Sequence, residues 1–435
     1  MNWAEQGAFY QIYPLGACGA PQIPDGETVN RIGRVTEWLP HLQKLGITAV
    51  YFGPVFESDH HGYDTRDYRV LDPRLGTNAD FREVCGALHE AGIRVVLDGV
   101  FNHVGRGFWA FRDVLEHGRE SRYKDWFYLS FEGRSTYGDP FWYQGWEGCF
   151  DLVKLNLKNP EVVDYLLDSV RFWVSEFGID GLRLDVAYSL EPDFMRRLRQ
   201  ESRSFKEDFW LLGECLHGDY NRFVNDEMLH SCTNYECYKG LYSALNSRNL
   251  FELCHSLNRQ FASDPWTLYR GKHLLCFADN HDVTRLASIL ENPRHIMIAY
   301  GLLFGMPGIP CIYYGSEWGI RGEKKDGDWS LRPEVVAPEW NANSVWIAKL
   351  IKAHCGSRAL TEGGFRNIHL TNTSCVFERA AEGERVLVAV NADAGDCRGY
   401  GEFNAAGGTD LLTGQWVSFE GGIPMAGYSV QFIAV

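Results

Sequence analysis

Short apolar runs alternate with amphipathic stretches along most of the chain, and this alternation predicts its fold. Between the runs, apolar residues recur at the three- to four-residue spacing of a helix face. No run is joined to the next by a two-residue hairpin turn, so we expect parallel strands connected through helices. The runs with the composition of buried strands are 8–13, 47–55, 93–103, the centre of 177–189, 210–217, 228–237, 273–282 and 309–314. The clearest helical patterns are 29–45, 79–91, 161–177, 191–201, 250–261 and 294–304.

Two segments break this alternation. Residues 104–154 are aromatic, glycine-rich and irregular, and a structureless loop of that length is uncommon inside a compact domain. We therefore expect a small inserted domain after the third strand. Residues 355–435 show short alternating runs separated by glycine turns, which predicts an antiparallel β-sandwich domain. The fold class is α/β: eight strands with interleaved helices form a (β/α)8 TIM barrel over 1–103 and 155–354.

Four of the predicted strands end in charged or imidazole side chains. One such strand end is compatible with a structural ion pair. In a parallel barrel, however, all carboxyl ends of the strands meet on one face, where active sites form. Four polar ends at one mouth therefore predict an active site. The residues are Asp98, Asn102 and His103; Arg183 and Asp185; Glu214; and His281 and Asp282.

Asp185, Glu214 and Asp282 place three carboxylates at this mouth. Two carboxylates that flank a glycosidic bond can perform its hydrolysis, one as nucleophile and one as general acid and base. Arg183 beside Asp185 is expected to keep that carboxylate ionised. Desolvation after the apolar run and Gly213 is expected to raise the pKa of Glu214.

His103 and His281 can donate hydrogen bonds to sugar hydroxyls. Metal binding is the alternative for histidines near carboxylates. We rank it lower, because no HxH or HxxxH spacing occurs among these residues.

Composition narrows the classes of partner. The net charge of −15, from 42 basic and 57 acidic residues, argues against nucleic acid and against anionic membranes. Aromatic residues make up 14% of the chain, which suits either a large core or a cleft that stacks on sugar rings. The 435 residues are enough for a barrel of about 250 residues plus additions.

The cysteines and the start of the chain suggest a compartment. The 12 cysteines form no CxxC pair, and several lie inside apolar runs. Residues 1–12 show no signal peptide, and no stretch approaches the roughly 18 apolar residues of a membrane span. We expect a cytoplasmic protein with reduced thiols.

Four segments resemble the ordered motifs of the α-amylase family, glycoside hydrolase family 13. They are DGVFNH (98–103), GLRLDVA (181–187), GECLH (213–217) and FADNHD (277–282). The resemblance implies Asp185 as nucleophile, Glu214 as general acid and base, and Asp282 as the carboxylate that stabilises the transition state. It also implies that anomeric configuration is retained.

The resemblance implies further contacts with substrate. Arg183, His103 and His281 are expected around the sugar that is cleaved. In HGYD (61–64), Tyr63 resembles the family's stacking tyrosine and Asp64 its supporting acid. In GDWSLRP (327–333), Asp328 and Arg332 resemble the pair that contacts the next sugar on the non-reducing side.

The chain also departs from the family pattern. Tyr188 and Ser189 stand where many amylases carry a Lys–His pair, which leaves the leaving-group subsite open. Lys154 and Asn156 in LVKLN (152–156) resemble the neopullulanase and cyclomaltodextrinase version of a fifth motif. Those enzymes usually carry an extra N-terminal domain, whereas this chain begins almost at its first predicted strand. Dimerisation through such a domain is not expected, and the oligomeric state stays open.

No cofactor is expected. The acidic calcium loop of some α-glucosidases is missing from 15–30. Asn102 matches a calcium-ligand position of many amylases, but a hydrogen bond within the strand end explains it equally well, so calcium is not assigned.

The sequence thus predicts a retaining glycoside hydrolase that acts on α-1,4 bonds through a covalent glycosyl-enzyme intermediate. Its expected substrates are maltooligosaccharides, starch fragments or cyclodextrins. Glucosyl transfer or isomerisation on the same intermediate is the alternative among enzymes. A catalytically silent sugar-binding relative is the alternative from another class, and the intact carboxylates argue against it. Endo or exo action, chain-length preference and α-1,6 tolerance stay open.

Overall fold

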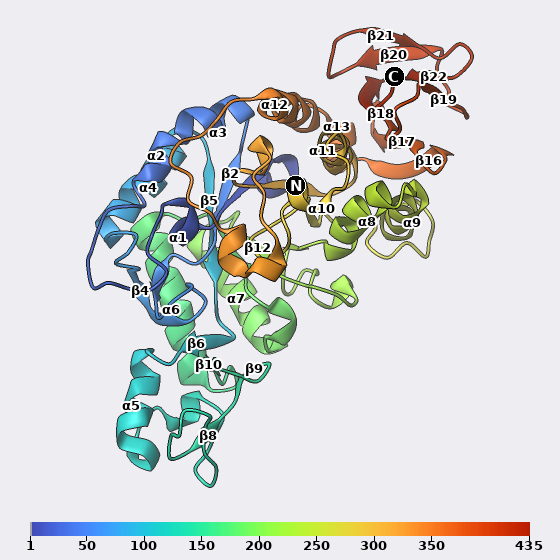
Figure 1. Ribbon diagram of the computed structural model, residues 1–435. Coiled ribbons are helices and arrows are strands. Elements are labelled where there is room, and N and C mark those ends of the chain that lie inside the picture. Colours follow the sequence, from blue (N-terminus) through green and yellow to red (C-terminus); the bar gives the residue numbers. More distant parts are fainter. Residues whose placement is uncertain (1) are drawn as a thin grey trace.

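Eight parallel strands form the centre of the computed structural model, which describes residues 2–435 (Figure 1). Their order is β13-β12-β11-β5-β2-β1-β15-β14. The two outer strands meet through a bridge between Thr233 and Leu275, which brings the sheet close to a closed cylinder. The predicted barrel is confirmed. The strands are β1 (Phe9–Ile12), β2 (Ala49–Phe52), β5 (Arg94–Gly99), β11 (Gly181–Leu184), β12 (Trp210–Gly213), β13 (Ser231–Cys232), β14 (Leu275–Phe277) and β15 (Ile309–Tyr313).

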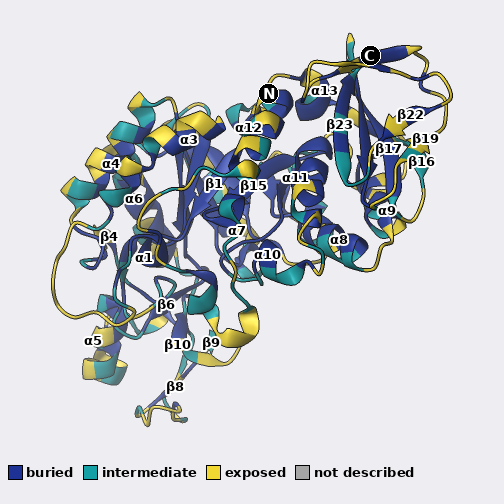
Figure 2. Ribbon diagram, turned by 45° about the horizontal axis from the view of Figure 1, so that its top comes forward, coloured by how far each residue is buried: buried dark blue, intermediate teal, exposed yellow. Residues whose placement is uncertain are grey.

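Helices surround this barrel and bury their apolar faces against it, leaving polar faces in solvent (Figure 2). They are α1 (Pro14–Ala17), α2 (Arg34–Glu37), α3 (Leu39–Leu45), α4 (Asn78–Glu90), α6 (Pro160–Phe177), α7 (Pro192–Phe205), α8 (Tyr235–Asn246), α9 (Leu250–Phe261), α10 (Leu286–Ile289), α11 (His295–Gly305) and α12 (Ala342–Cys355).

Local signals set the ends of helix α6, which leads into the central strand. The Asn159 side chain accepts a hydrogen bond from the Glu161 N–H at 2.9 Å, and Pro160 occupies the first helical position. Both features favour a helix start. Gly178 ends the helix with a φ of 69°, a left-handed conformation that glycine adopts without steric penalty. The sequence predicted this ending correctly.

Close packing then fixes the approach of β11 to β12. A Cβ atom on Gly181 would lie 2.5 Å from the Trp210 carbonyl oxygen. Only glycine permits this spacing.

Several predicted elements were wrong in extent: the strands predicted over 93–103, 210–217 and 273–282 are shorter in the structure, as β5, β12 and β14. Two further cases have a clear local cause. The helix expected over 29–45 is split into α2 and α3, because Pro40 lacks an N–H and its ring obstructs a continuous helix. The strand expected over 228–237 is reduced to β13, since the Asn234 side chain accepts from the Cys237 N–H at 3.0 Å and starts helix α8.

An antiparallel hairpin that the sequence did not predict follows β2. It consists of β3 (Phe56–Ser58) and β4 (Thr65–Leu71). Its connecting loop, 59–64, carries the HGYD motif to the mouth of the barrel.

A small sheet and one helix project from the barrel after β5 (Figure 1). The sheet has the order β6-β10-β9, with β6 (His103–Gly105), β9 (Gly145–Trp146) and β10 (Cys149–Lys154). The helix is α5 (Trp109–His117), and a two-stranded ribbon joins β7 (Leu129–Ser130) to β8 (Trp142–Tyr143). Because Lys154 pairs with His103 in this sheet, the projection is anchored beside the mouth of the barrel.

The C-terminal region forms an antiparallel sheet beyond helix α13 (Arg358–Glu362). Its order is β16-β17-β18-β23-β20-β21, and the ribbon β19–β22 packs against β17 and β18 around a separate apolar core. The strands are β16 (Gly364–Leu370), β17 (Ser374–Ala381), β18 (Glu384–Asn391), β19 (Cys397–Gly399), β20 (Gly407–Asp410), β21 (Trp416–Ser418), β22 (Ile423–Met425) and β23 (Ser429–Ala434).

Across residues 2–435, none of the helices combines the length and the apolar character needed to span a membrane.

Candidate active site

A pocket of about 340 Å³ opens at the carboxyl ends of the barrel strands. Seven of the ten site residues predicted from the sequence line it: Tyr63, His103, Asp185, Glu214, Asp282, Asp328 and Arg332. The other three, Asp64, Arg183 and His281, are buried behind the pocket wall.

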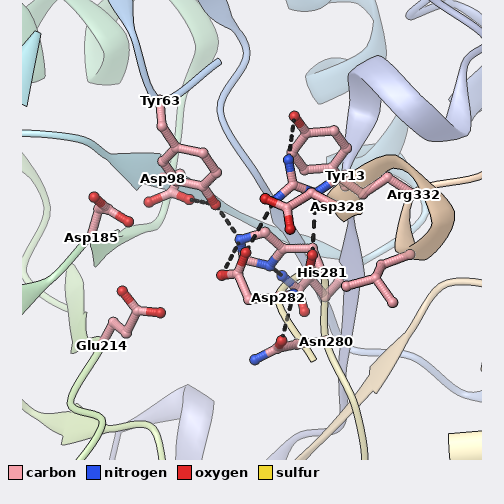
Figure 3. A network of polar contacts seen from close by, with 12 residues as sticks. Tyr13, Tyr63, Asp98, Asp185, Glu214, Asn280, His281, Asp282, Asp328 and Arg332 are labelled. Atoms are coloured by element: carbon pink, nitrogen blue, oxygen red, sulfur yellow. Dashed lines mark hydrogen bonds and ion pairs between the residues drawn. The ribbon is translucent and has the colours of Figure 1, made fainter. Parts of the chain in front are cut away.

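Neighbouring strands bring Asp185 and Glu214 together. Leu184 pairs with Gly213 in the register of β11 and β12, so the two carboxylates follow directly at matching positions. Arg183 then bridges them: its Nη1 lies 2.9 Å from Asp185 Oδ1, and its Nη2 lies 2.7 Å from Glu214 Oε1. The two side chains lie on one side of the pocket in Figure 3. The two carboxylates therefore share one cation and face the same pocket.

Val186 holds an unusual backbone conformation between these carboxylates. Its φ is 40° and its ψ is 49°, a left-handed region that β-branched residues rarely adopt. In this conformation its N–H donates to Glu214 Oε2 at 3.0 Å. Strained residues of this kind concentrate at functional sites, and here the strain orients a carboxylate.

Asp282 occupies the opposite side of the pocket (Figure 3). Its Oδ2 lies 2.9 Å from His281 Nε2, and its Oδ1 lies 3.0 Å from Arg332 Nη2. Burial alone would raise the pKa of Asp282, but His281 and the Arg332 charge hold it well below its usual range. Asp282 therefore remains an anion, as expected of a carboxylate that stabilises positive charge.

His281 is fixed on every side. Its ring lies between the rings of Tyr13 and Tyr63, with centroids 5.8 and 5.6 Å away and nearly parallel planes. Gln11 Nε2 donates to Nδ1 at 2.8 Å, which leaves the ring proton on Nε2, facing Asp282. Burial lowers the pKa of His281, which favours this neutral form.

His103 offers an unused polar atom to the pocket. Its Nε2 is buried, has no hydrogen-bond partner among the described residues, and lies 3.9 Å from Asp185 Oδ2. Burial lowers its pKa to about 3, so the ring is neutral near pH 7. A buried polar atom without a partner is costly, and a hydroxyl in the pocket would satisfy it.

The protonation of Asp185 differs from the expectation. Burial raises its pKa well above the usual range; Arg183 lowers it, while Glu214 and Asp98 raise it. The main reason is burial, and the arginine that lowers this pKa also contacts Asp98 at 2.9 Å and Glu214, whose charges raise it. One guanidinium shared among three buried carboxylates cannot keep Asp185 at an ordinary pKa. The predicted pKa of Glu214 stays a prediction.

Asp64 supports the hairpin loop rather than facing the pocket. It is 1% exposed and accepts from His60 Nδ1 at 3.0 Å and from the His61 N–H at 3.1 Å. Asp328 is more open and pairs with Lys324, which also lines the pocket.

The Asn102 side chain already binds a cationic side chain of the protein, Lys154. Its Oδ1 accepts from Lys154 Nζ at 3.1 Å, so a calcium ion bound to this oxygen would meet a like charge. Residues 2–435 also contain no group of three or more His, Cys, Asp or Glu arranged to hold a metal ion. The Asn102 oxygen, with Lys154 bound to it, therefore does not suit a calcium ion.

Sequence reasoning missed several supporting residues. Gln11 and Tyr13 hold His281, while Asn280 Oδ1 accepts from the Asp282 N–H at 2.8 Å and Tyr235 lies 3.5 Å from Glu214. Gln11 left one signal, since it is the single polar residue of the otherwise apolar β1. Asn280 left another, since it lies in FADNHD (277–282) and its contact with Asp282 is local. Tyr13 and Tyr235 carry no local pattern, because their role depends on contacts between distant segments.

The fold and this pocket define an enzyme class: a (β/α)8 barrel with carboxylates at the carboxyl ends of its strands. Comparisons with known proteins agree. Residues 25–355 match the model of the α-amylase catalytic domain. The chain belongs to the α-amylase family of glycoside hydrolases.

Individual relatives refine this placement. The chain is 34% identical over 422 residues to neopullulanase 2 of Thermoactinomyces vulgaris, covering 90% of this chain and 70% of that protein. It is 30% identical over 424 residues to a cyclomaltodextrinase of Bacillus sp, covering 90% and 73%. Among solved structures, the cyclic α-maltosyl-(1→6)-maltose hydrolase of Arthrobacter globiformis superposes with a TM-score of 0.85 at 27% identity, covering all of both chains.

Proposed function

We propose that this protein is a retaining glycoside hydrolase that cleaves α-1,4-glucosidic bonds through a covalent glycosyl-enzyme intermediate. One observation carries the proposal: Asp185 and Glu214 face one pocket and are bridged by the single guanidinium of Arg183. Paired carboxylates close enough to share a partner suit a retaining mechanism, in which they stand about 5–5.5 Å apart.

The reaction follows from the positions of these groups. Asp185 attacks the anomeric carbon while Glu214 protonates the leaving oxygen, and the glycosyl group becomes bonded to Asp185. Glu214 then removes a proton from water, which attacks the same carbon and releases Asp185. The orphaned Nε2 of His103 and the anionic Asp282 face the sugar and bind its hydroxyls and its developing positive charge.

The excess of carboxylates over cations in this buried cluster favours a retained proton, which the first step needs. Full ionisation would place four negative charges against two guanidinium groups, so the buried cluster favours retaining a proton. These groups titrate together rather than one by one, and the first step draws on a proton of this cluster to protonate the leaving oxygen. The carboxylates are Asp98, Asp185, Glu214 and Asp282, and the cations are Arg183 and Arg332.

The relatives and the pocket walls support the proposed substrate class. Relatives named neopullulanase and cyclomaltodextrinase support maltooligosaccharides, starch fragments or cyclodextrins as substrates. Tyr188 and Leu216 line the pocket together with Glu214. They give the leaving-group side an aromatic and aliphatic surface in place of the Lys–His pair of many amylases.

The central experiment replaces each carboxylate by its amide. Asp185→Asn and Glu214→Gln are expected to keep the fold, judged by circular dichroism, and to lower kcat on maltoheptaose by at least about 10²-fold. The matched control is Asp328→Asn, a pocket carboxylate away from the reacting bond, which should act mainly on KM. Turnover close to wild type in either amide variant would refute the assignment.

Glucosyl transfer is the second candidate, and the apolar wall of Tyr188 and Leu216 favours it, because a sugar acceptor packs on such a surface better than water does. Product analysis on maltotriose separates the two: oligomers longer than the substrate indicate transfer, whereas glucose and maltose indicate hydrolysis. Affinity for maltotriose without any turnover would instead indicate a sugar-binding protein.

A further inference from the structure

A second cavity, of about 140 Å³, lies at the opposite end of the barrel from the active site. Its walls come from the loop between α9 and β14, the turn before β15 and the start of the C-terminal region. These loops precede the barrel strands, whereas the active site follows them. The cavity therefore belongs to the junction between barrel and C-terminal sheet, and not to the catalytic pocket.

Arg379 of β17 forms the floor of this cavity and has no carboxylate partner. It is 1% exposed. It donates to the carbonyl oxygens of Gly363 and Gly305, both at 2.9 Å, and of Gly364 at 3.2 Å. No ion pair to it exists among residues 2–435, although Arg74, equally buried, pairs with Asp72 at 2.7 Å.

The bonding of Arg379 is also incomplete. A guanidinium has five N–H groups, and these carbonyls engage one on each of its three nitrogens. The other two have no acceptor within residues 2–435. Burial lowers the pKa of Arg379 to about 9. A buried cation in this condition gains strongly from an anion.

The rest of the cavity lining adds positive charge. Arg270 and Lys272 line it together with Arg379, and Lys272 Nζ already donates to the Val224 carbonyl oxygen. His273 also lines it, but burial lowers the pKa of this ring, which is therefore neutral. Glu362 is the one acidic residue of the lining, and Arg358 already pairs with it at 3.1 Å. Arg379 and Arg270 are thus two cations of one cavity without a carboxylate partner among the described residues, on a chain whose net charge is −15.

We propose that this cavity binds a tetrahedral oxyanion of the size of inorganic phosphate. The buried Arg379 would supply its two free N–H groups, and Arg270 at the exposed rim would supply a second cation. Guanidinium forks match the oxygen geometry of phosphate. The bound anion would join the loop between α9 and β14 to the C-terminal sheet, and so stabilise the junction.

The test uses the full chain with inorganic phosphate, in isothermal titration calorimetry and in thermal unfolding, against sodium chloride at matched ionic strength. Wild type is expected to bind phosphate saturably and to unfold at a higher temperature in its presence. Arg270→Ala removes the rim cation without touching the buried one, and should weaken binding about tenfold. Arg379→Lys keeps the positive charge but loses the paired N–H donors of the guanidinium, so it should also weaken phosphate binding.

Arg398→Ala is the matched control, because Arg398 also donates to backbone carbonyls of the C-terminal region but lies outside the cavity. It should bind phosphate like wild type. The proposal is overturned if wild type gains nothing over sodium chloride, if Arg270→Ala binds as tightly as wild type, or if Arg398→Ala weakens binding as much as Arg270→Ala. Tighter binding of acetate than of phosphate would also overturn it, since the site would then be one for carboxylates.

Discussion

At the scale of single residues, the active site depends on groups held in conformations or charge states that they would not adopt alone. Val186 is left-handed at φ 40°, and Asp185 shares its cation with other carboxylates. Both features are energetically unfavourable by themselves. Each can be tested by a substitution that relieves it.

Relief of strain at Val186 should make the glycine variant more stable than the alanine variant, which is the reverse of the usual order of stability. Val186→Ala removes two buried methyl groups and Val186→Gly removes Cβ as well, but only glycine is free of the left-handed penalty of about 1–2 kcal/mol. We expect the glycine variant to have the higher free energy of unfolding in urea. The control is Ala187, in the adjoining helical turn. There glycine should be less stable than alanine, as usual, so Ala187→Gly should lower the free energy of unfolding. An alanine variant more stable than the glycine variant at position 186 would contradict the assigned conformation.

The shared charge of Asp185 predicts a pH dependence. Because burial and the neighbouring carboxylates raise its pKa, the acid limb of kcat/KM should lie above the ordinary aspartate value of about 3.9. Asp98→Asn removes one negative neighbour and frees Arg183 for Asp185, so the pKa of Asp185 falls and the limb moves to lower pH.

The measurement is a profile of kcat/KM between about pH 4 and 8. The readout is the pH at which the acid limb falls, and not the maximal value of kcat/KM. Asp328→Asn is the control, since Asp328 is not among the groups that shift the pKa of Asp185. A limb that stays in place in Asp98→Asn would show that Asp98 does not act on the nucleophile.

At the scale of elements, one buried carboxylate ties several parts of the barrel together below the site. Asp180, just before β11, is 2% exposed and accepts from His89 of α4 at 2.8 Å, and from Arg94 of β5 and Lys206, after α7, at 2.9 Å each. Burial would raise the pKa of Asp180, but His89, Lys206 and the Val95 N–H lower it well below its usual range.

Asp180→Asn should therefore destabilise the protein at neutral pH. The partners are partly exposed, so we expect about 2 kcal/mol, below the full effect of breaking a buried pair. A carboxylate with a depressed pKa stabilises the fold above its unfolded value of about 3.9, and loses that effect as pH falls further. The difference from wild type in urea unfolding should thus shrink below about pH 4.

Asp208→Asn provides the control at the same arginine. Asp208 pairs with Arg94 at 3.0 Å, but its side chain is 45% exposed, so its loss should change stability by less than about 1 kcal/mol. Equal effects of the two variants would contradict the importance of burial.

At the scale of the whole molecule, three distant segments build the pocket walls. Trp146 comes from the projection after β5, Lys324 from the loop after β15, and Tyr63 from the hairpin after β2. Trp146 lies over His103, with ring centroids 5.7 Å apart. It therefore offers the substrate an aromatic surface from outside the barrel.

Trp146→Ala should raise KM for maltoheptaose by about three- to tenfold with little change in kcat, because stacking contributes about 0.5–1.5 kcal/mol equally before and during the reaction. Trp142→Ala is the control, since Trp142 belongs to the same projection but does not line the pocket. A fall in kcat with unchanged KM would place Trp146 in the chemical step instead.

Much of this architecture could be predicted because it is local. The alternation of apolar runs and helical faces determined the barrel, Gly178 determined the end of α6, and the polar strand ends determined where Asp185 and Glu214 would gather. These features depend on spacing along the chain and on the rule that parallel strands share one carboxyl face. The predicted domain boundaries at 103/104, 154/155 and 354/355 stay predictions.

Only the tertiary structure decided how the charges are shared. The sequence placed Arg183 beside Asp185, but the sheet brings Asp98 and Glu214 to the same guanidinium. Likewise, nothing local marks Arg379 as a buried cation without a carboxylate, since its neighbours come from α11 and from the segment after α13. Local pattern determines where a side chain starts, whereas its pKa and its unmet hydrogen bonds depend on which distant segments surround it.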